Sequence, residues 1–196
     1  MSLVEERPRR ADAVRNRASV VAAAAAVFAE RGLDASVPEI AARAGVGKAT
    51  VYRSFATKEH LVAAVLLERL AAFEAGIRAA QEADDAWLAL RAVMLEKAAG
   101  MAGDRALAGG MSRVITLPEV AAAHASVWTA LGALIERAQA QGGMRPDVGA
   151  EDLRVLWAGV CRVLSAEQQA DPAAWRRYAA LVLASLRADG APAPLD

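Results

Sequence analysis

Segment 36–61 constrains the fold more than any other part of the chain, and it reads SVPEIAARAGVGKATVYRSFATKEHL. Ser36 followed three residues later by Glu39 is the pattern of a capping box, so a helix is expected to begin directly after Ser36. Gly45 is placed to end that helix in the left-handed conformation, which glycine adopts without strain. A second helix, over about Lys48 to Phe55, follows after two residues. The segment therefore predicts a helix-turn-helix unit.

The second helix of this unit has one face suited to a protein core and another suited to DNA. Val51 and Phe55 lie four residues apart, so they are expected to be buried on the same side. The remaining side chains are small, hydroxylic or basic, which are the types that a major groove accepts. They are Lys48, Ala49, Thr50, Tyr52, Arg53 and Ser54.

These outward side chains indicate two kinds of contact with a duplex. Thr50 offers a hydroxyl and a methyl group to base edges, and Arg53 can donate to a guanine or to a phosphate. Tyr52 can reach a phosphate through its hydroxyl, and Lys48 is expected beside the DNA backbone. Thr57 is placed to cap the next helix. The unit is therefore predicted to be a DNA reader.

Residues 45–61, GVGKATVYRSFATKEHL, resemble the signature of the TetR family of ligand-responsive repressors, and the resemblance extends over about Arg10 to Val65. It implies that the second helix reads the major groove and that Lys58 contacts a phosphate from the start of a long fourth helix. Gly47 stands where the family often has a serine cap, a change that costs only a few tenths of a kcal/mol. Ser54 stands where a histidine often precedes the phenylalanine, which affects a DNA contact and not the fold.

The composition predicts an almost entirely helical chain. Its 196 residues are 56% hydrophobic, with long alanine runs and few β-branched stretches, enough for a sizeable core in one or two domains. The formal net charge is zero, but residues 1–60 carry ten Lys and Arg against seven Asp and Glu, whereas residues 61–196 carry thirteen against sixteen. The basic excess therefore lies with the predicted DNA reader.

A basic stretch precedes the helix-turn-helix unit and contains Arg7, Arg9, Arg10, Arg15 and Arg17. It can lie along phosphates or reach into a minor groove, and Arg10 and Ser36 complete the expected set of DNA contacts. A solvated N-terminal tail is the alternative interpretation of residues 7–10.

Helical periodicity continues to the end of the chain. Helices are expected over about 12–30, 37–44, 48–55, 57–81, from 86 onward, 116–141, from 151 onward and from 172 onward, with a glycine-broken stretch at 100–110. The spacing places Val14, Val21, Ala25 and Phe28 on one stripe of the first helix, and Thr116 with Glu119 has the pattern of a capping box. The fold class is all-α with about nine helices: a helix-turn-helix head at 1–56, a helical effector-binding and dimerisation domain at 57–190, and a frayed tail at 191–196. The helix at 57–81 would link the two domains, so its displacement would move the reader.

The last two helices carry long apolar stripes. They can complete the core of one protomer, or pair with a second copy as a four-helix bundle. The family resemblance implies the second arrangement, and a dimer suits the reading of two half-sites about one helical turn apart. The residues expected at this interface are Leu153, Leu156, Trp157, Val160, Leu164, Trp175, Tyr178 and Val182.

Large or polarizable side chains in the middle of the chain are the candidates for an effector pocket: Trp87, Met94, Met101, Met111, His124 and Trp128. The resemblance implies a small effector bound between the long linking helix and the next three helices. Residues of these types at helical spacing also serve as ordinary core. His124 can anchor an effector or make a structural hydrogen bond.

The sequence has no pattern typical of an enzyme. It lacks a G-x-S-x-G element and a phosphate-binding glycine loop, and its two histidines, His60 and His124, have no cluster of cysteines or carboxylates at ligand spacing, so neither a cofactor nor a metal is expected. The acidic pairs at 84–85 and 151–152 stand at predicted helix starts, where acids favour the helix dipole. The single cysteine, Cys161, is expected to be core, with a redox switch as the alternative.

The resulting hypothesis is a homodimeric, TetR-like regulator that represses from a pseudo-palindromic operator and releases it when a small molecule binds. Its partners would be double-stranded DNA, the unidentified effector and a second copy of the chain. The run 20–28 is too short to cross a bilayer, so no membrane association and a cytoplasmic location are expected. The alternatives are a regulator controlled by a protein partner, and a helical carrier or interaction module that does not bind DNA.

Overall fold

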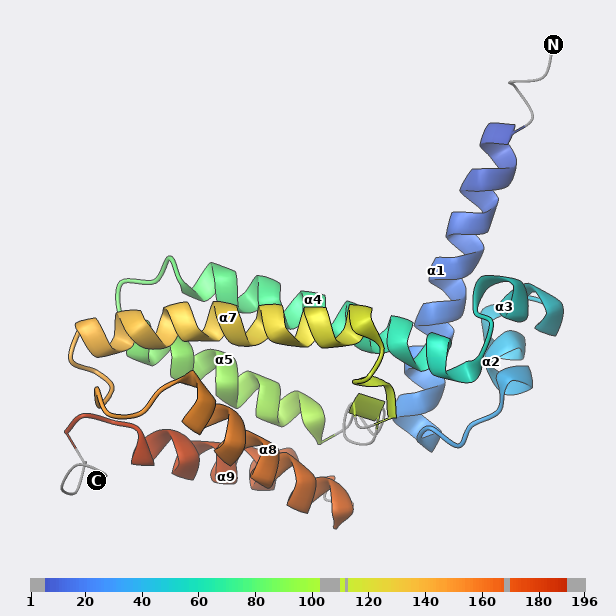
Figure 1. The fold of residues 1–196 in the computed structure, drawn as a ribbon. Helices are drawn as coiled ribbons and strands as arrows, with labels where there is room; N and C mark the ends of the chain where they lie inside the picture. The colour runs from blue at the N-terminus through green and yellow to red at the C-terminus, as the bar shows by residue number, and fades with distance from the viewer. Residues whose placement is uncertain (1–5, 103–109, 112, 168–169, 190–196) are drawn as a thin grey trace.

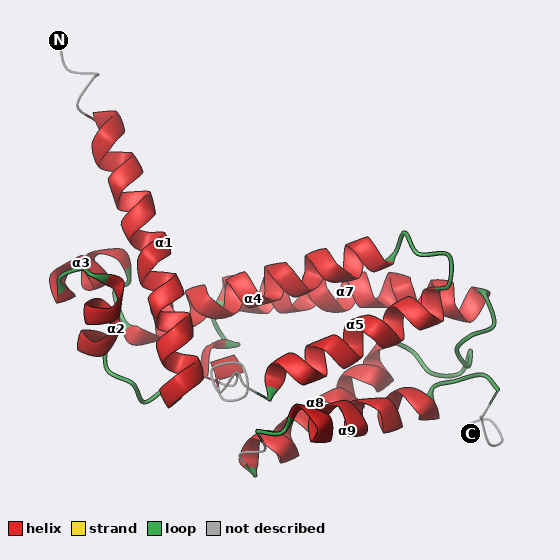
Figure 2. Cartoon of the chain, turned by 180° about the vertical axis from the view of Figure 1, so that it is seen from behind, coloured by secondary structure: helices red, strands yellow, loops and turns green. Residues whose placement is uncertain are grey.

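The computed structural model describes residues 6–102, 110–111, 113–167 and 170–189, with side chains from residue 12 onward. The main helices in these residues are α1 (Glu6–Arg31), α2 (Val37–Ala44), α3 (Lys48–Ser54), α4 (Lys58–Ala80), α5 (Ala86–Met101), α7 (Pro118–Ala140), α8 (Ala150–Ala166) and α9 (Pro172–Ser185). Figure 2 shows only helices and loops in this part of the chain. The predicted all-α fold is confirmed. The predicted tail at 191–196 lies outside the described residues.

Helices α1, α2 and α3 form a head at one end of the molecule (Figure 1). Its core contains Val20, Ala24 and Phe28 of α1, Ile40 of α2 and Val51 of α3, all buried. Helix α1 begins six residues earlier than predicted, and its first turns project beyond the rest of the head (Figure 1). Val14, which the periodicity assigned to the buried stripe, is therefore 67% exposed.

Local capping explains where the helices of the head begin and end. Ser36 Oγ accepts a hydrogen bond from the Glu39 N–H, and Glu39 accepts one from the Ser36 N–H at 2.8 Å, so the predicted capping box is confirmed. Gly45 ends α2 with φ of 68°, in the left-handed region that favours glycine. Gly47 caps α3 without a side-chain bond, and Thr57 accepts from the His60 N–H at the start of α4.

The body of the molecule has three layers, in which α5 lies between the α4–α7 pair and the α8–α9 pair (Figure 1). Helix α4 extends from the head into this body, as predicted for the linking helix. Its buried side chains include Val62, Leu66, Leu70 and Ile77. Head and body therefore share one continuous helix and one continuous apolar core.

The far end of α4 is also fastened to α7 by directional hydrogen bonds. Gln81 Nε2 donates to the Ala130 carbonyl at 2.8 Å, and Arg137 donates to the carbonyls of Gln81 and of Ala83, the latter at 2.8 Å. Gln141 Nε2 donates to the Asp84 carbonyl at 2.9 Å. The bonds from Arg137 and Gln141 pair carbonyls that the turn between α4 and α5 leaves without helical partners.

Helix α7 begins differently from the prediction. The sequence suggested a capping box of Thr116 and Glu119, but the N-cap is Leu117, which makes no side-chain bond. Pro118 occupies the first helical position, where its missing N–H breaks no intrahelical bond. The prediction was wrong because the helix starts one residue later than the capping pattern requires.

The acidic pairs stand at helix starts, as expected. Asp85 accepts from the Leu88 N–H at 2.8 Å at the start of α5, and Asp152 accepts from the Gly149 N–H at 2.8 Å at the start of α8. Asp171 caps α9 by accepting from the Ala173 N–H at 2.9 Å. Within the described ranges, no helix combines the length and the apolar character that crossing a bilayer requires.

Candidate nucleic-acid interface

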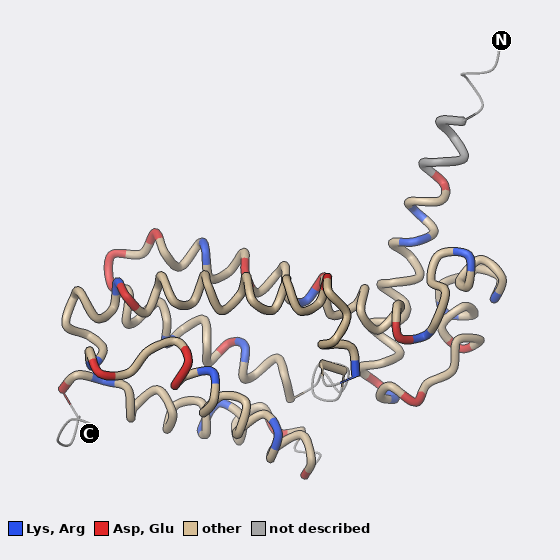
Figure 3. The backbone as a smooth tube through the Cα atoms, viewed as in Figure 1, with Lys and Arg blue, Asp and Glu red and all other residues tan. Residues whose placement is uncertain are grey.

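Helix α3 presents one buried and one open face. Val51 and Phe55 are 1% and 3% exposed, which confirms them as the anchors of this short helix in the head. Of the predicted DNA contacts on α3, Lys48, Ala49, Tyr52 and Arg53 are exposed, and Thr50 and Ser54 are half-buried. Figure 3 shows basic positions on α3 and on the projecting part of α1.

Four of the predicted contacts on α3 form two pairs. Arg53 Nη2 donates to Thr50 Oγ1 at 2.9 Å, which joins the two residues predicted to reach base edges. The Lys48 ammonium lies 5.7 Å from the centroid of the Tyr52 ring, which joins the two residues predicted to reach phosphates. The outward face of α3 therefore carries a hydroxyl–guanidinium pair and an ammonium–phenol pair.

Ser54 is engaged inside the head. Its hydroxyl donates to the Thr50 carbonyl at 3.2 Å, and its own carbonyl accepts from Arg17 Nη1 at 3.0 Å. The Arg17 guanidinium also lies 4.2 Å from the centroid of the Phe55 ring. Arg17 therefore ties α1 to the end of α3, a role that the sequence analysis missed. Arg17 and Ser54 are 37 residues apart, and no local pattern links them.

The other predicted DNA contacts lie around α3. Ser36 is exposed, and its hydroxyl bonds to Glu39 Oε2 at 2.9 Å within the capping box. The Ser36 N–H and hydroxyl, and then Arg31, hold the pKa of Glu39 below its ordinary value. Lys58 is half-buried at the first position of α4. The side chain of Arg10 lies outside the described residues.

The six effector-pocket candidates fall in different places. Trp87 and Met94 are buried in the main core, where the Trp87 indole N–H has no acceptor among the described residues. Met101 belongs to a smaller cluster with Leu164 and Trp175, and Met111 is half-buried against the main core. His124 and Trp128 line a common hollow.

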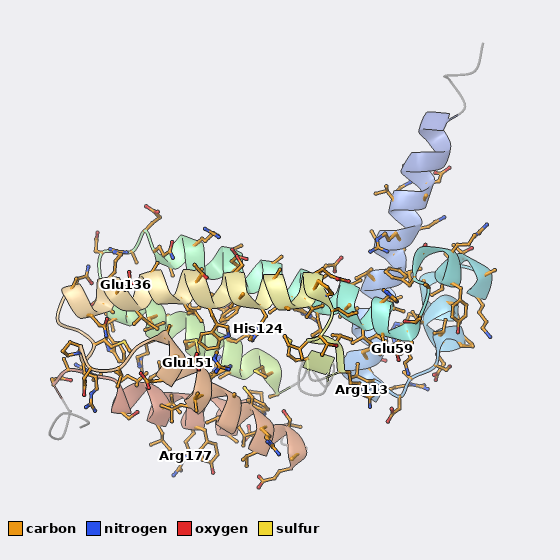
Figure 4. The ribbon with its side chains drawn as sticks, in the orientation of Figure 1. Glu59, Arg113, His124, Glu136, Glu151 and Arg177 are labelled. Atoms are coloured by element: carbon orange, nitrogen blue, oxygen red, sulfur yellow. The ribbon has the colours of Figure 1, made fainter. Side chains whose placement is uncertain are left out.

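This hollow lies at the surface between α7 and the start of α8. His124 Nε2 accepts from Trp128 Nε1 at 3.1 Å, which favours a neutral imidazole. Burial, and secondarily the nearby Arg154, lower the pKa of His124. Figure 4 labels His124 and Glu136 on α7, and Glu151, the salt-bridge partner of Arg154, on α8. The hollow thus combines a neutral ring and charged groups with small apolar walls from Ala125, Ala133 and Ala150.

The α8–α9 pair both completes the core and leaves an apolar face open. Of the predicted interface residues, Leu153, Leu164 and Trp175 are buried within the protomer, and Trp157, Val160 and Val182 are half-buried. Leu156 and Tyr178 are more than 40% exposed. The same two helices expose three further residues that the sequence analysis did not assign to an interface: Val155, Val163 and Leu181.

Cys161 lies in this region as a packed thiol. Its Sγ is 3.6 Å from Met101 Sδ, and burial raises its pKa to about 11. A thiol of this kind stays protonated near neutrality, which agrees with the expectation of a core residue. Elsewhere in the described chain, no three His, Cys, Asp or Glu residues are grouped as a metal site would require.

A three-helix head with an outward basic helix, carried on a helical body, defines a helix-turn-helix DNA-binding protein. Comparison with family models agrees. Residues 20–65 match the model of bacterial regulatory proteins of the tetR family, and residues 82–188 match that of the C-terminal domain of SbtR-like transcriptional regulators. The protein therefore belongs to the TetR family of DNA-binding transcriptional regulators, whose members are regulators and not enzymes.

Solved structures support the same assignment. A TetR regulatory protein from Mycobacterium vanbaalenii is 36% identical, with a TM-score of 0.60 over 82% of this chain and 98% of that chain. The regulator SCO0520 from Streptomyces coelicolor is 30% identical, with a TM-score of 0.65 over 88% and 98%. SmeT, the repressor of a Stenotrophomonas maltophilia multidrug efflux pump, shares the fold at 24% identity, with a TM-score of 0.67 over 92% and 97%. No curated protein gives a significant match.

Proposed function

We propose that the protein is a homodimeric repressor that binds a pseudo-palindromic operator through α3 and releases it when a small molecule occupies the helical body. The outward face of α3 is the observation that carries this proposal. It combines side chains suited to base edges with side chains suited to phosphates, on a helix anchored by Val51 and Phe55. We propose the same domain division as the sequence indicates, with the head ending at residue 56 and the body spanning 57–190.

A dimer is proposed because α8 and α9 leave an apolar face open to solvent. The exposed side chains are Val155, Leu156, Val163, Tyr178 and Leu181. A second copy related by a two-fold axis would cover the same face on both protomers. It would also supply the second head that a palindrome requires, with half-sites about 34–36 Å apart.

The dimer is tested by charge substitution on this face. Val163→Glu combined with Leu181→Glu is expected to convert a dimer into a monomer in light scattering, because the charges would be buried without partners. Leu88→Glu is the control, since Leu88 is equally exposed, at 56%, but belongs to α5 and not to the two helices of the proposed interface. If the double variant remains dimeric, α8 and α9 do not form the dimer interface.

The proposed release mechanism uses the unequal attachment of α4. Its far end is held to α7 by the bonds of Gln81, Arg137 and Gln141, whereas Val62 and Leu66 near the head make apolar contacts. Apolar contacts are non-directional, so the head end can change its packing more easily. An effector that binds better to a DNA-incompetent arrangement would lower operator affinity by a coupling of typically about 1–3 kcal/mol.

Operator binding is tested by selecting genomic fragments with the purified protein and footprinting those retained at two salt concentrations. We expect a protected palindrome whose affinity falls steeply with salt, because basic residues replace counterions on phosphates. The protected fragment then serves in a screen for small molecules that release it. An empty genomic selection would contradict DNA-mediated function altogether.

A further inference from the structure

We propose that Thr50 and Arg53 recognise one guanine in each half-site as a coupled pair, with Thr50 as the positioning residue that orients the Arg53 guanidinium. This inference rests on the proposed function, because it assumes that α3 enters the operator. It goes further by naming the base that is read and the intramolecular contact that makes the reading selective.

The contact between the two side chains is direct. Arg53 Nη2 donates to Thr50 Oγ1 at 2.9 Å, one helical turn away on the outward face of α3. Thr50 is half-buried and adjoins Val51, which anchors the helix, so its β-branched side chain is a stiff acceptor. Within the described residues the Arg53 side chain bonds to Thr50, and this contact sets its direction.

The hydrogen-bonding capacity of the pair fits a guanine. A guanidinium has five N–H donors, so four remain after one is given to Thr50. Two of these are enough for guanine O6 and N7, the commonest specific contact in a major groove. The hydroxyl hydrogen of Thr50 stays available for a neighbouring acceptor on a base or phosphate. Because Thr50 orients the Arg53 guanidinium before DNA binds, the side chain loses less conformational entropy on contact with the base.

The other pair on α3 explains why Arg53 is assigned to a base. The Lys48 ammonium, held over the Tyr52 ring, is a compact charge that suits phosphate without needing an oriented plane. A planar guanidinium held by a neighbouring hydroxyl binds most strongly where two acceptors lie side by side, as on guanine, because it can then form two parallel hydrogen bonds. The two pairs therefore divide phosphate binding and base reading between them.

The experiment begins with selection of an operator from randomised duplexes by the wild-type dimer. At each base pair of the half-site, affinity for guanine is then compared with affinity for adenine, at a salt concentration where every variant still binds. We expect one guanine to be preferred roughly 5- to 150-fold. Arg53→Lys keeps the charge but loses the planar pair of donors, so it should strongly reduce this preference.

Thr50 variants separate positioning from general affinity. Thr50→Val keeps the shape of the side chain but lacks the hydroxyl acceptor, so it should reduce the guanine preference about threefold or more. Thr50→Ser keeps the hydroxyl and should therefore retain most of the preference. Adding Thr50→Val to Arg53→Lys should cause no further loss of preference, because the two residues act together. The melting temperature of each variant reports whether the head is still folded.

Two results would overturn the inference. One is an operator with no base pair whose preference depends on Arg53, and the other is a Thr50→Val protein that prefers guanine as strongly as the wild type. Failure of the proposed function looks different, because the wild type would then enrich no sequence at all, and this inference would fall with it.

Discussion

The guanidinium of Arg17 lies 4.2 Å from the centroid of the Phe55 ring and donates to the carbonyl of the neighbouring Ser54. That carbonyl belongs to the last turn of α3, where helical carbonyls have no intrahelical partner. Arg17 therefore pairs an orphan acceptor and covers a core aromatic ring at once. The orientation of the DNA-facing helix depends in part on a side chain from α1.

We predict that Arg17→Ala lowers the free energy of unfolding by about 1 kcal/mol, because Arg17 itself is exposed and a hydrogen bond or cation–π contact from an exposed side chain contributes modestly. Operator affinity should fall as well, because the last turn of α3 loosens. Arg17→Lys keeps the charge without the planar group, so it should retain only part of the stability and part of the operator affinity. Urea titration and fluorescence anisotropy measure the two effects, and an unchanged Arg17→Ala protein would show that the contact is dispensable.

Gly143 lies against the buried Trp87, and a Cβ atom at this position would stand 2.7 Å from the Trp87 Cβ. Gly143→Ala is therefore expected to cost about 1–3 kcal/mol, because backbone or core must shift. Gly76→Ala is the opposite control, since Gly76 is exposed within α4 with nothing within 4 Å of an added Cβ. That variant should gain up to about 1 kcal/mol. Thermal melts of both would contradict this account if their shifts had the same sign.

The capping box of α2 should make stability depend on acid. Glu39 has a pKa below its ordinary 4.5, so the folded state binds its proton more weakly than the unfolded state does. The stabilisation is complete above about pH 4.5 and disappears as the pH falls through the lowered folded pKa. Glu39→Gln should lower the melting temperature at pH 7 and flatten its decline in acid. Ser36→Ala should act in the same direction. If the melting temperatures of the wild type and both variants fall in parallel as the pH is lowered, the capping box is not the source of this acid dependence.

Cys161 is the only cysteine of the chain, so thiol labelling reports on this position alone. Its pKa of about 11, against an ordinary 9.0, makes the thiolate roughly a hundredfold scarcer at pH 8 in the folded state. We predict that a disulfide reagent modifies the native protein at least tenfold more slowly than the urea-unfolded protein. Cys161→Ser, which has no thiol, is the negative control. Equal labelling rates would mean that the thiol is open to solvent.

Capping patterns made much of the head predictable from sequence. The cap at Ser36, the turn at Gly45 and the cap at Thr57 each depend on residues within three or four positions, so the sequence shows them directly. The same logic failed at Thr116, where a proline one residue after Leu117 defines the helix start. Helical periodicity, in turn, placed Val14 in a core that does not extend so far along α1.

Long-range contacts could not be predicted in this way. The bond from Arg17 to Ser54 spans 37 residues, and that from Arg137 to Ala83 spans 54. On α8 and α9 the apolar spacing is similar for Leu153, which is buried, and Leu156, which is open. Periodicity shows that a helix has an apolar stripe, but neighbouring helices decide which part of the stripe they cover.

The sequence by itself determined the helical class, the helix-turn-helix unit and the identity of the side chains on α3, because these depend on local caps, short spacings and residue chemistry. Only the tertiary structure decided how those side chains pair, which α1 residue holds α3, where α4 is fastened and which apolar residues stay open. Each of these depends on groups distant in sequence that meet only when helices pack, so their contacts follow from the geometry of the whole core.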